Sequence, residues 1–169
     1  MARAHTLPAA RALAMLRIVT GGILLTAAVG KLVWYKIGGA VPFPVTSVVW
    51  QQELPARLAE WLRLHPAGIL AAVVRDLLLP NGLLVAGLMA WSQLIAGLLL
   101  LLGLFTRGAA SLAALVAAIL ALLATVRGGT DARPYILLCA LALAFLIGNA
   151  GETFGMDGVR RERRRDRVL

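Results

Sequence analysis

Long apolar runs separated by short polar turns dominate the hydropathy pattern of this chain. Four runs reach or approach the roughly 20 residues that cross a membrane as a helix. They predict spans at about residues 13–35, 82–104, 109–126 and 134–150. A cleaved signal peptide is the alternative for the first run, because small residues within it form a weak cleavage pattern. We therefore expect an all-α integral membrane protein, a four-helix bundle forming one membrane domain over residues 1–169.

The segment 36–81 has a different pattern, because it holds five of the seven prolines and only short apolar stretches. Leu58, Trp61 and Leu62 share one face at helical spacing, while the charged residues around them lie elsewhere, which predicts a short amphipathic helix. The stretch 67–79 is too short to span a membrane at about 1.5 Å per residue. We expect both pieces to lie in the membrane interface or to cap the bundle. A re-entrant segment is the alternative.

Composition supports the membrane prediction. Hydrophobic residues make up 60% of the 169 residues and charged residues 15%, against roughly 45–50% and 25% in soluble domains. A soluble enzyme and a disordered chain are therefore excluded as defaults. The net charge of +9 could indicate nucleic-acid binding, but so apolar a chain has little room for a charged groove. We assign the excess of arginine to membrane topology and expect no nucleic-acid partner.

Four spans place both termini on the same side. Ten basic residues then lie on the side of the termini, six of them in the tail 158–169, and seven lie on the other side. This bias predicts an inner-membrane protein with both termini in the cytoplasm and segment 36–81 outside. Trp34, Tyr35 and Trp50 are expected in an outer aromatic belt. The basic tail is expected to attract anionic lipid.

Few polar residues interrupt the predicted spans. Lys31 lies near the outer end of the first, where it can snorkel to the interface or bind an anion or a quinone carbonyl. Gln93 lies near the middle of the second, where an amide needs a partner. That partner is either another helix, in a bond worth about 1 kcal/mol, or a ligand. With the neighbouring Trp34, these residues form a hypothetical quinone or ligand site.

A second polar group is predicted at the cytoplasmic end, from Arg107 in the turn after the second span and from Glu152 and Asp157 after the fourth. Anchoring, helix capping and ion pairing are the structural alternatives for these residues. The lone Cys139 excludes an internal disulfide or a paired-thiol centre. Both histidines lie outside the spans, so a bis-histidine haem within the bilayer is not expected. We expect no metal site and no covalent cofactor, with bound quinone or lipid as the remaining possibility.

Three stretches of the chain resemble the DoxX/DoxD-like membrane proteins. They are residues 16–32, which end in Gly-Lys-Leu, residues 79–107, which end in Gly-Leu-Phe-Thr-Arg, and residues 149–157, which end in Gly-Met-Asp. The resemblance covers nearly the whole chain and implies a four-helix membrane bundle. It also implies a role in redox assemblies, because one branch of the family is the small subunit of thiosulfate:quinone oxidoreductase. That enzyme passes electrons from thiosulfate to quinone.

One position departs from the family pattern, in which an acidic residue is common where this chain has Gln93. This departure favours a structural or accessory role over proton or quinone chemistry. We predict an accessory membrane subunit of a quinone-linked redox assembly, bound to other subunits and to membrane lipids. The alternative is a catalytically active small subunit that binds quinone within the bundle. A transporter is disfavoured, because the spans carry few ionisable groups.

Overall fold

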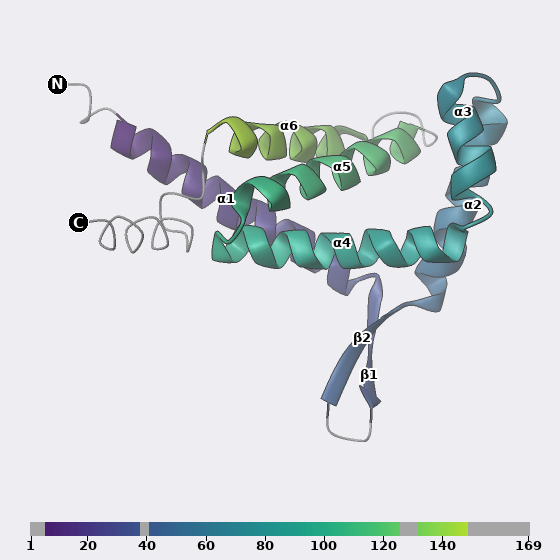
Figure 1. Cartoon of the computed structure of the whole chain (residues 1–169), viewed down its shortest axis with the longest axis horizontal. Coiled ribbons are helices and arrows are strands. Elements are labelled where there is room, and N and C mark those ends of the chain that lie inside the picture. Colours follow the sequence, from purple (N-terminus) through teal and green to yellow (C-terminus); the bar gives the residue numbers. More distant parts are fainter. Residues whose placement is uncertain (1–5, 38–40, 126–131, 149–169) are drawn as a thin grey trace, which may run out of the picture.

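The computed structural model shows a bundle of apolar helices with a cap across one end (Figure 1). The structure describes residues 6–37, 41–125 and 132–148. The bundle helices are α1 (Thr6–Val29), α4 (Gly82–Leu102), α5 (Thr106–Ala124) and α6 (Arg133–Ile147). The first three are long and apolar enough to cross a membrane, and α6 is a shorter apolar helix of 15 residues. The predicted membrane fold is thus confirmed for three helices.

Close approach between α1 and α4 depends on two glycines. A Cβ atom added at Gly21 would lie 2.9 Å from the carbonyl oxygen of Gly97, and one added at Gly97 would lie 2.9 Å from the side chain of Leu25. Helices in a membrane associate mainly through such packing, because lipid provides no hydrophobic driving force between them. These two glycines therefore set the distance between α1 and α4.

The fourth span stays a prediction. At about 1.5 Å per residue, α6 measures about 22 Å, which is less than the roughly 30 Å of a hydrocarbon core. It packs along α5, and the side chains of Leu138, Ala142 and Phe145 are buried there. The basic tail 158–169 lies outside the described residues.

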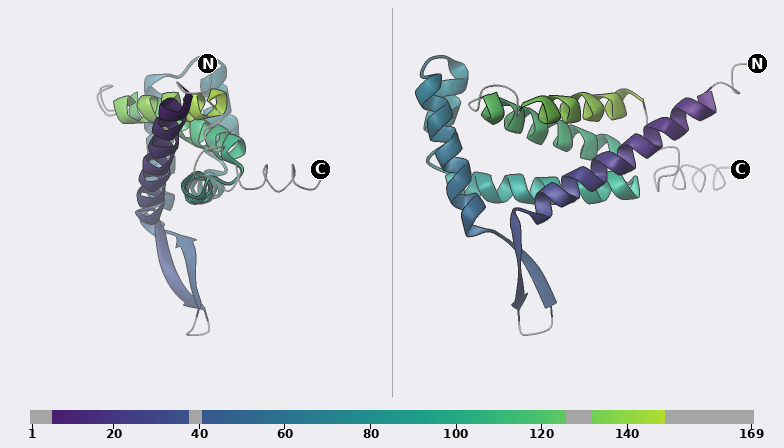
Figure 2. Two further views of the ribbon diagram at one scale, coloured as in Figure 1. Left: turned by 90° about the vertical axis from the view of Figure 1, so that its left-hand side faces the viewer. Right: turned by 180° about the vertical axis from the view of Figure 1, so that it is seen from behind.

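The first predicted span was wrong at its end. It was drawn as far as Tyr35, but α1 ends at Val29, and Leu32–Ile37 form strand β1. This strand pairs antiparallel with β2 (Val41–Thr46) in a two-stranded sheet that projects from the bundle (Figure 2). The residues of β1 are mainly β-branched or aromatic and favour a pleated strand over a helix.

The cap is larger than the short helical segment predicted between the first two spans. Helix α2 (Val48–Leu64) lies across the end of the bundle where α4 begins (Figure 1). The Ser47 hydroxyl caps it by accepting a bond from Trp50 N at 3.2 Å. The predicted apolar face of this helix is confirmed, because Leu58 and Trp61 are buried. A short α3 (Ile69–Val73) and a π-helical turn η1 (Val74–Leu78) lead back to α4.

Candidate functional site

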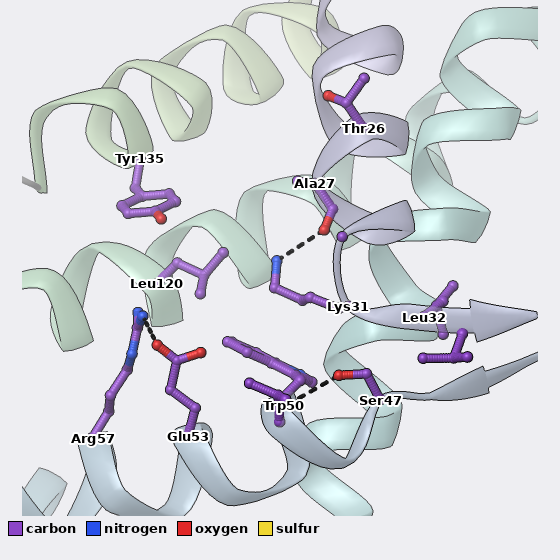
Figure 3. Close-up of a pocket in the computed structure, with 13 residues that line it drawn as sticks. Thr26, Ala27, Lys31, Leu32, Ser47, Trp50, Glu53, Arg57, Leu120 and Tyr135 are labelled. Carbon is purple, nitrogen blue, oxygen red and sulfur yellow. Dashed lines mark hydrogen bonds and ion pairs between the residues drawn. The ribbon is translucent and has the colours of Figure 1, made fainter.

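A pocket of about 520 Å³ lies at the capped end, between α1, α2, α5 and α6 (Figure 3). Its wall is apolar where Leu32, Trp50 and Leu120 contribute. The polar side chains that line it are Thr26, Lys31, Ser47, Glu53, Arg57 and Tyr135. Residues far apart in the sequence thus meet around one space, with a few polar groups in an otherwise apolar wall. This combination is typical of small-molecule sites.

Lys31 is the central polar residue of this pocket. Its ammonium donates to the side-chain oxygen of Gln93 at 2.7 Å and to the carbonyl oxygen of Ala27 at 3.3 Å. It also lies 4.8 Å from the centre of the Trp50 ring, at the distance of a cation–π contact. The structure therefore brings together Lys31 and Gln93, the two polar residues that the sequence analysis singled out 62 positions apart.

Local structure explains why Lys31 points here. It follows the end of α1, and its backbone N–H donates to the Ala28 carbonyl at 2.9 Å. Its own carbonyl accepts from Ser47 N at 2.8 Å, which ties the base of the sheet to the start of α2. Both backbone groups of Lys31 are thereby fixed between a helix end and the hairpin, so its side chain is directed into the pocket (Figure 3).

Trp50 is the aromatic residue of the site that the sequence analysis missed. Its indole N–H donates to the Ala86 carbonyl of α4 at 3.1 Å, and the side chain is buried. The prediction that Trp50 belongs to an outer aromatic belt was therefore wrong. Trp34, the aromatic residue proposed beside Lys31, lies in β1, is 51% exposed and does not line the pocket. Trp50 lies in the first turn of α2, and the fold brings that turn beneath Lys31. The distance between the two residues along the sequence does not predict this contact.

The pocket is lined by two basic side chains, Lys31 and Arg57, and one acidic side chain, Glu53. Burial and, to a lesser extent, the positive charge of Arg57 lower the pKa of Lys31, Glu53 opposes them, and the net pKa is about 8. Glu53 and Arg57 form an ion pair one helical turn apart on α2. Within the described part of the chain, the buried Nε of Arg57 has no hydrogen-bond partner. Two basic groups against one carboxylate make the pocket suited to a ligand with electron-rich oxygen atoms.

The second predicted polar group is only partly described. Arg107 lies in the first turn of α5, exposed, at the end of the bundle away from the pocket. Glu152 and Asp157 lie outside the described residues. The sequence analysis did not single out Arg17, which is fully buried in α1. The described residues contain no group of three or more histidine, cysteine or acidic side chains that could hold a metal ion.

The comparison with protein families gives one match. The model described as "TQO small subunit DoxD" matches residues 54–167, which include Gln93, Arg57 and Tyr135 but begin after Lys31 and Trp50. No curated protein and no solved structure matched the chain. The family match covers more than half of the chain and agrees with the resemblance seen in the sequence. The chain belongs to the DoxD family, that of the small subunit of thiosulfate:quinone oxidoreductase.

Proposed function

We propose that this chain is the integral membrane subunit of a thiosulfate:quinone oxidoreductase-type assembly, and that it contributes a binding pocket for the quinone headgroup. One observation carries the proposal. The Lys31 ammonium lies at the wall of the pocket, where the Gln93 amide and the Trp50 ring hold it in place. An ammonium group has three donors, and the described contacts use two of them. One N–H is left for a ligand.

The pocket fits a quinone in size and in chemistry. Its volume of about 520 Å³ falls within the roughly 300–1,000 Å³ usual for small-molecule sites. A quinone headgroup is a planar ring whose carbonyl oxygens accept hydrogen bonds. Lys31, Arg57 and Tyr135 carry hydrogen-bond donors and line the wall. A bound quinone would accept electrons delivered by a partner subunit.

Each residue around the pocket has a separate task in this proposal. Lys31 binds a carbonyl oxygen and, with a pKa of about 8, can hold or release a proton near neutral pH. Gln93 positions the ammonium through the 2.7 Å bond. Trp50 offers its ring face, and the apolar side chain of Leu120 helps to keep water from the wall. The chain's single cysteine leaves no dithiol of its own to carry electrons.

We further propose that α6 completes the predicted fourth span and that the pocket faces the outer side of the bacterial inner membrane. The support is the count along the whole sequence, in which ten of the seventeen basic residues, six of them in the tail 158–169, fall on the side of the termini. Basic residues favour the cytoplasmic side. Both termini would then be cytoplasmic and the cap would lie outside.

An accessory role without a ligand is the alternative. It is favoured by the contacts of Lys31, because two oxygen acceptors and an aromatic ring already stabilise its charge. Thiosulfate is a second possible occupant, since basic groups outnumber the carboxylate in the pocket. The size and apolar wall of the pocket suit a larger, less polar molecule better.

The test is equilibrium binding of decylubiquinone to the full chain in lipid nanodiscs. We expect saturable binding by the wild type and at least about tenfold weaker binding by Lys31→Met, which removes a charge-assisted bond worth roughly 1.5–3 kcal/mol. Lys36→Met is the matched control, because Lys36 is exposed on β1 outside the pocket. Equal affinity of Lys31→Met and wild type, or no binding to either, would leave the accessory role. Displacement by thiosulfate would assign the pocket to the anion.

A further inference from the structure

The two outer edges of the β1–β2 hairpin are not equivalent. Opposed residues in an antiparallel pair alternate between pairs that exchange backbone hydrogen bonds and pairs that do not. Ser47 N donates to Lys31 O, so Lys31 and Ser47 form a hydrogen-bonded pair. The register places Leu32 opposite Thr46, and this next pair is therefore not hydrogen-bonded within the hairpin. The outward-facing backbone groups therefore belong to Leu32, Trp34 and Lys36 on β1, and to Pro42, Pro44 and Thr46 on β2.

The outer edge of β2 is closed to further pairing. Pro42 and Pro44 have no backbone N–H to offer, and proline is a common means of protecting an edge strand. The carbonyl oxygen of Thr46 already accepts a bond from the side-chain amide of Gln51 at 3.0 Å. None of the three outward-facing residues of β2 can therefore both donate and accept a backbone hydrogen bond to a further strand.

The outer edge of β1 has none of these devices. Leu32, Trp34 and Lys36 retain both N–H and C=O, and beyond the buried Leu32 at its base no element of the described chain runs along the outer edge of β1 (Figures 1 and 2). The side chains on this strand are also exposed beyond its base, with Trp34 at 51% and Tyr35 at 64%. The hairpin therefore presents one open edge, flanked by aromatic side chains.

The hairpin lies at the level of the apolar part of α4, where unpaired backbone groups of the open edge cost free energy. Phe43 of β2 packs on Trp91 of α4 with ring centroids 5.9 Å apart, and the Thr46 hydroxyl lies 3.7 Å from a Cβ built at Gly87. These contacts fall about 8 to 14 Å from the start of α4 at 1.5 Å per residue. Leu83 and Leu84, nearer that start, are exposed apolar residues. The hairpin thus leaves the bundle beside the apolar span, where lipid cannot satisfy backbone groups.

We propose that β1 pairs antiparallel with β1 of a second copy of this chain, about a two-fold axis at Trp34. The product is a four-stranded sheet in the order β2–β1–β1–β2. Two copies satisfy each other through the open edges of their β1 strands, and the proline-blocked β2 edges at both sides end the sheet. A two-fold interface of this kind is closed, so it gives a dimer and not a filament.

Charge and packing select the register. With Trp34 on the axis, each Leu32 faces Lys36 of the other copy, and the two lysines lie at opposite ends of the interface. A register centred on Lys36 would place like charges directly opposite, which is unfavourable. A register centred on Leu32, which is 5% exposed against the bundle, would force the two bundles together. In the Trp34 register the two exposed Trp34 residues at the centre exchange two backbone hydrogen bonds.

Cysteine cross-linking in native membranes tests the contact. Trp34→Cys is introduced with Cys139→Ala, so that the chain has one thiol, and mild oxidation should give a disulfide-linked band at twice the mass of the 17.9 kDa chain. Directly opposed residues in such a pair have Cα atoms about 5.5 Å apart, within disulfide range. Val45→Cys is the control, because it is 39% exposed on β2 and the two copies would be several strands apart. No Trp34 dimer, or equal dimer from Val45→Cys, overturns the proposal.

A second pair of variants tests the backbone bonds themselves. Trp34→Pro removes the outward N–H of β1, as Pro44 does on the opposed position of β2, whereas Trp34→Val keeps it. By mass measurement in nanodiscs, the wild type and Trp34→Val should be dimers and Trp34→Pro a monomer. A monomeric wild type, or a dimer that persists in Trp34→Pro, contradicts the pairing. Cross-linking of Trp34→Cys to a different polypeptide would assign the edge to another subunit and overturn the homodimer.

Discussion

The middle of the bundle and its capped end are stabilised in different ways. In the middle, α1 and α4 touch through glycine backbone and α5 contributes a buried face of alanines, including Ala109, Ala113 and Ala117. At the capped end, the buried residues are large, such as Trp50 and Trp61, and polar groups meet around the pocket. Small residues let helices approach each other closely in lipid. Bulky residues on the crossing helix α2 keep the bundle helices further apart at the capped end. The close packing in the middle thus positions the cap, and the polar groups of the pocket gather at the capped end.

The largest expected effect comes from adding one methyl group in the middle. Gly21→Ala would place a Cβ 2.9 Å from Gly97 O and from Leu101 N, both of them backbone atoms that cannot turn aside. We expect a loss of stability of about 1–3 kcal/mol, as for other overpacked cores. Thermal unfolding in detergent measures it. Gly22→Ala is the neighbouring control, because a Cβ there meets nothing within 4 Å. Equal unfolding temperatures of the two variants would show that the α1–α4 contact is loose.

A change of pH should act on the capped end. Because burial lowers the pKa of Lys31 to about 8, its ammonium is charged below that pH and increasingly neutral above it. If the charged form binds decylubiquinone, affinity should fall roughly tenfold between about pH 7 and pH 9, following the protonated fraction. Binding measured across this range tests the idea. A flat profile in the wild type would exclude Lys31 as the titrating donor.

Gln93→Glu sharpens the same test. A carboxylate in place of the amide would favour the charged form of Lys31 and raise its pKa. The fall in affinity should then move to higher pH, while Lys31→Met should show no such transition. An unchanged profile in Gln93→Glu would show that the 2.7 Å bond between these side chains does not control the proton.

The smallest effect is expected from Trp50→Phe. This change keeps an aromatic ring beneath Lys31 but removes the buried N–H that donates to Ala86 O at 3.1 Å. Stability should fall by about 1 kcal/mol, the usual net value of a hydrogen bond, and quinone affinity should change little. Unfolding and binding measured on one preparation separate the two effects. A large loss of affinity with unchanged stability would mean that the indole itself contacts the ligand.

Local patterns in the sequence predicted most of the bundle. The apolar run that begins at Gly82 has the length of a span, and α4 occupies it almost as predicted. The same argument failed after Val29, because Lys31 is the only charged residue before Tyr35 and the apolar run resumes after it. The β-branched and aromatic residues of β1 and the Gly-Gly pair at 38–39 are a hairpin signal. The prediction followed the hydropathy of the segment and not the hairpin signal, because over a few positions an apolar strand has the same hydropathy as part of a membrane span.

The sequence by itself determined that this is a membrane protein of three or more apolar helices, and that Lys31 and Gln93 each need a partner. Burial of apolar length and the cost of an unpartnered polar group are properties of single segments, so they can be read from one stretch of chain. Only the tertiary structure decided that these two residues are each other's partner, and that Trp50 takes the place expected for Trp34. Those contacts depend on how closely α1 approaches α4 and on where α2 crosses the bundle. Both are set by packing between segments that are distant in the sequence.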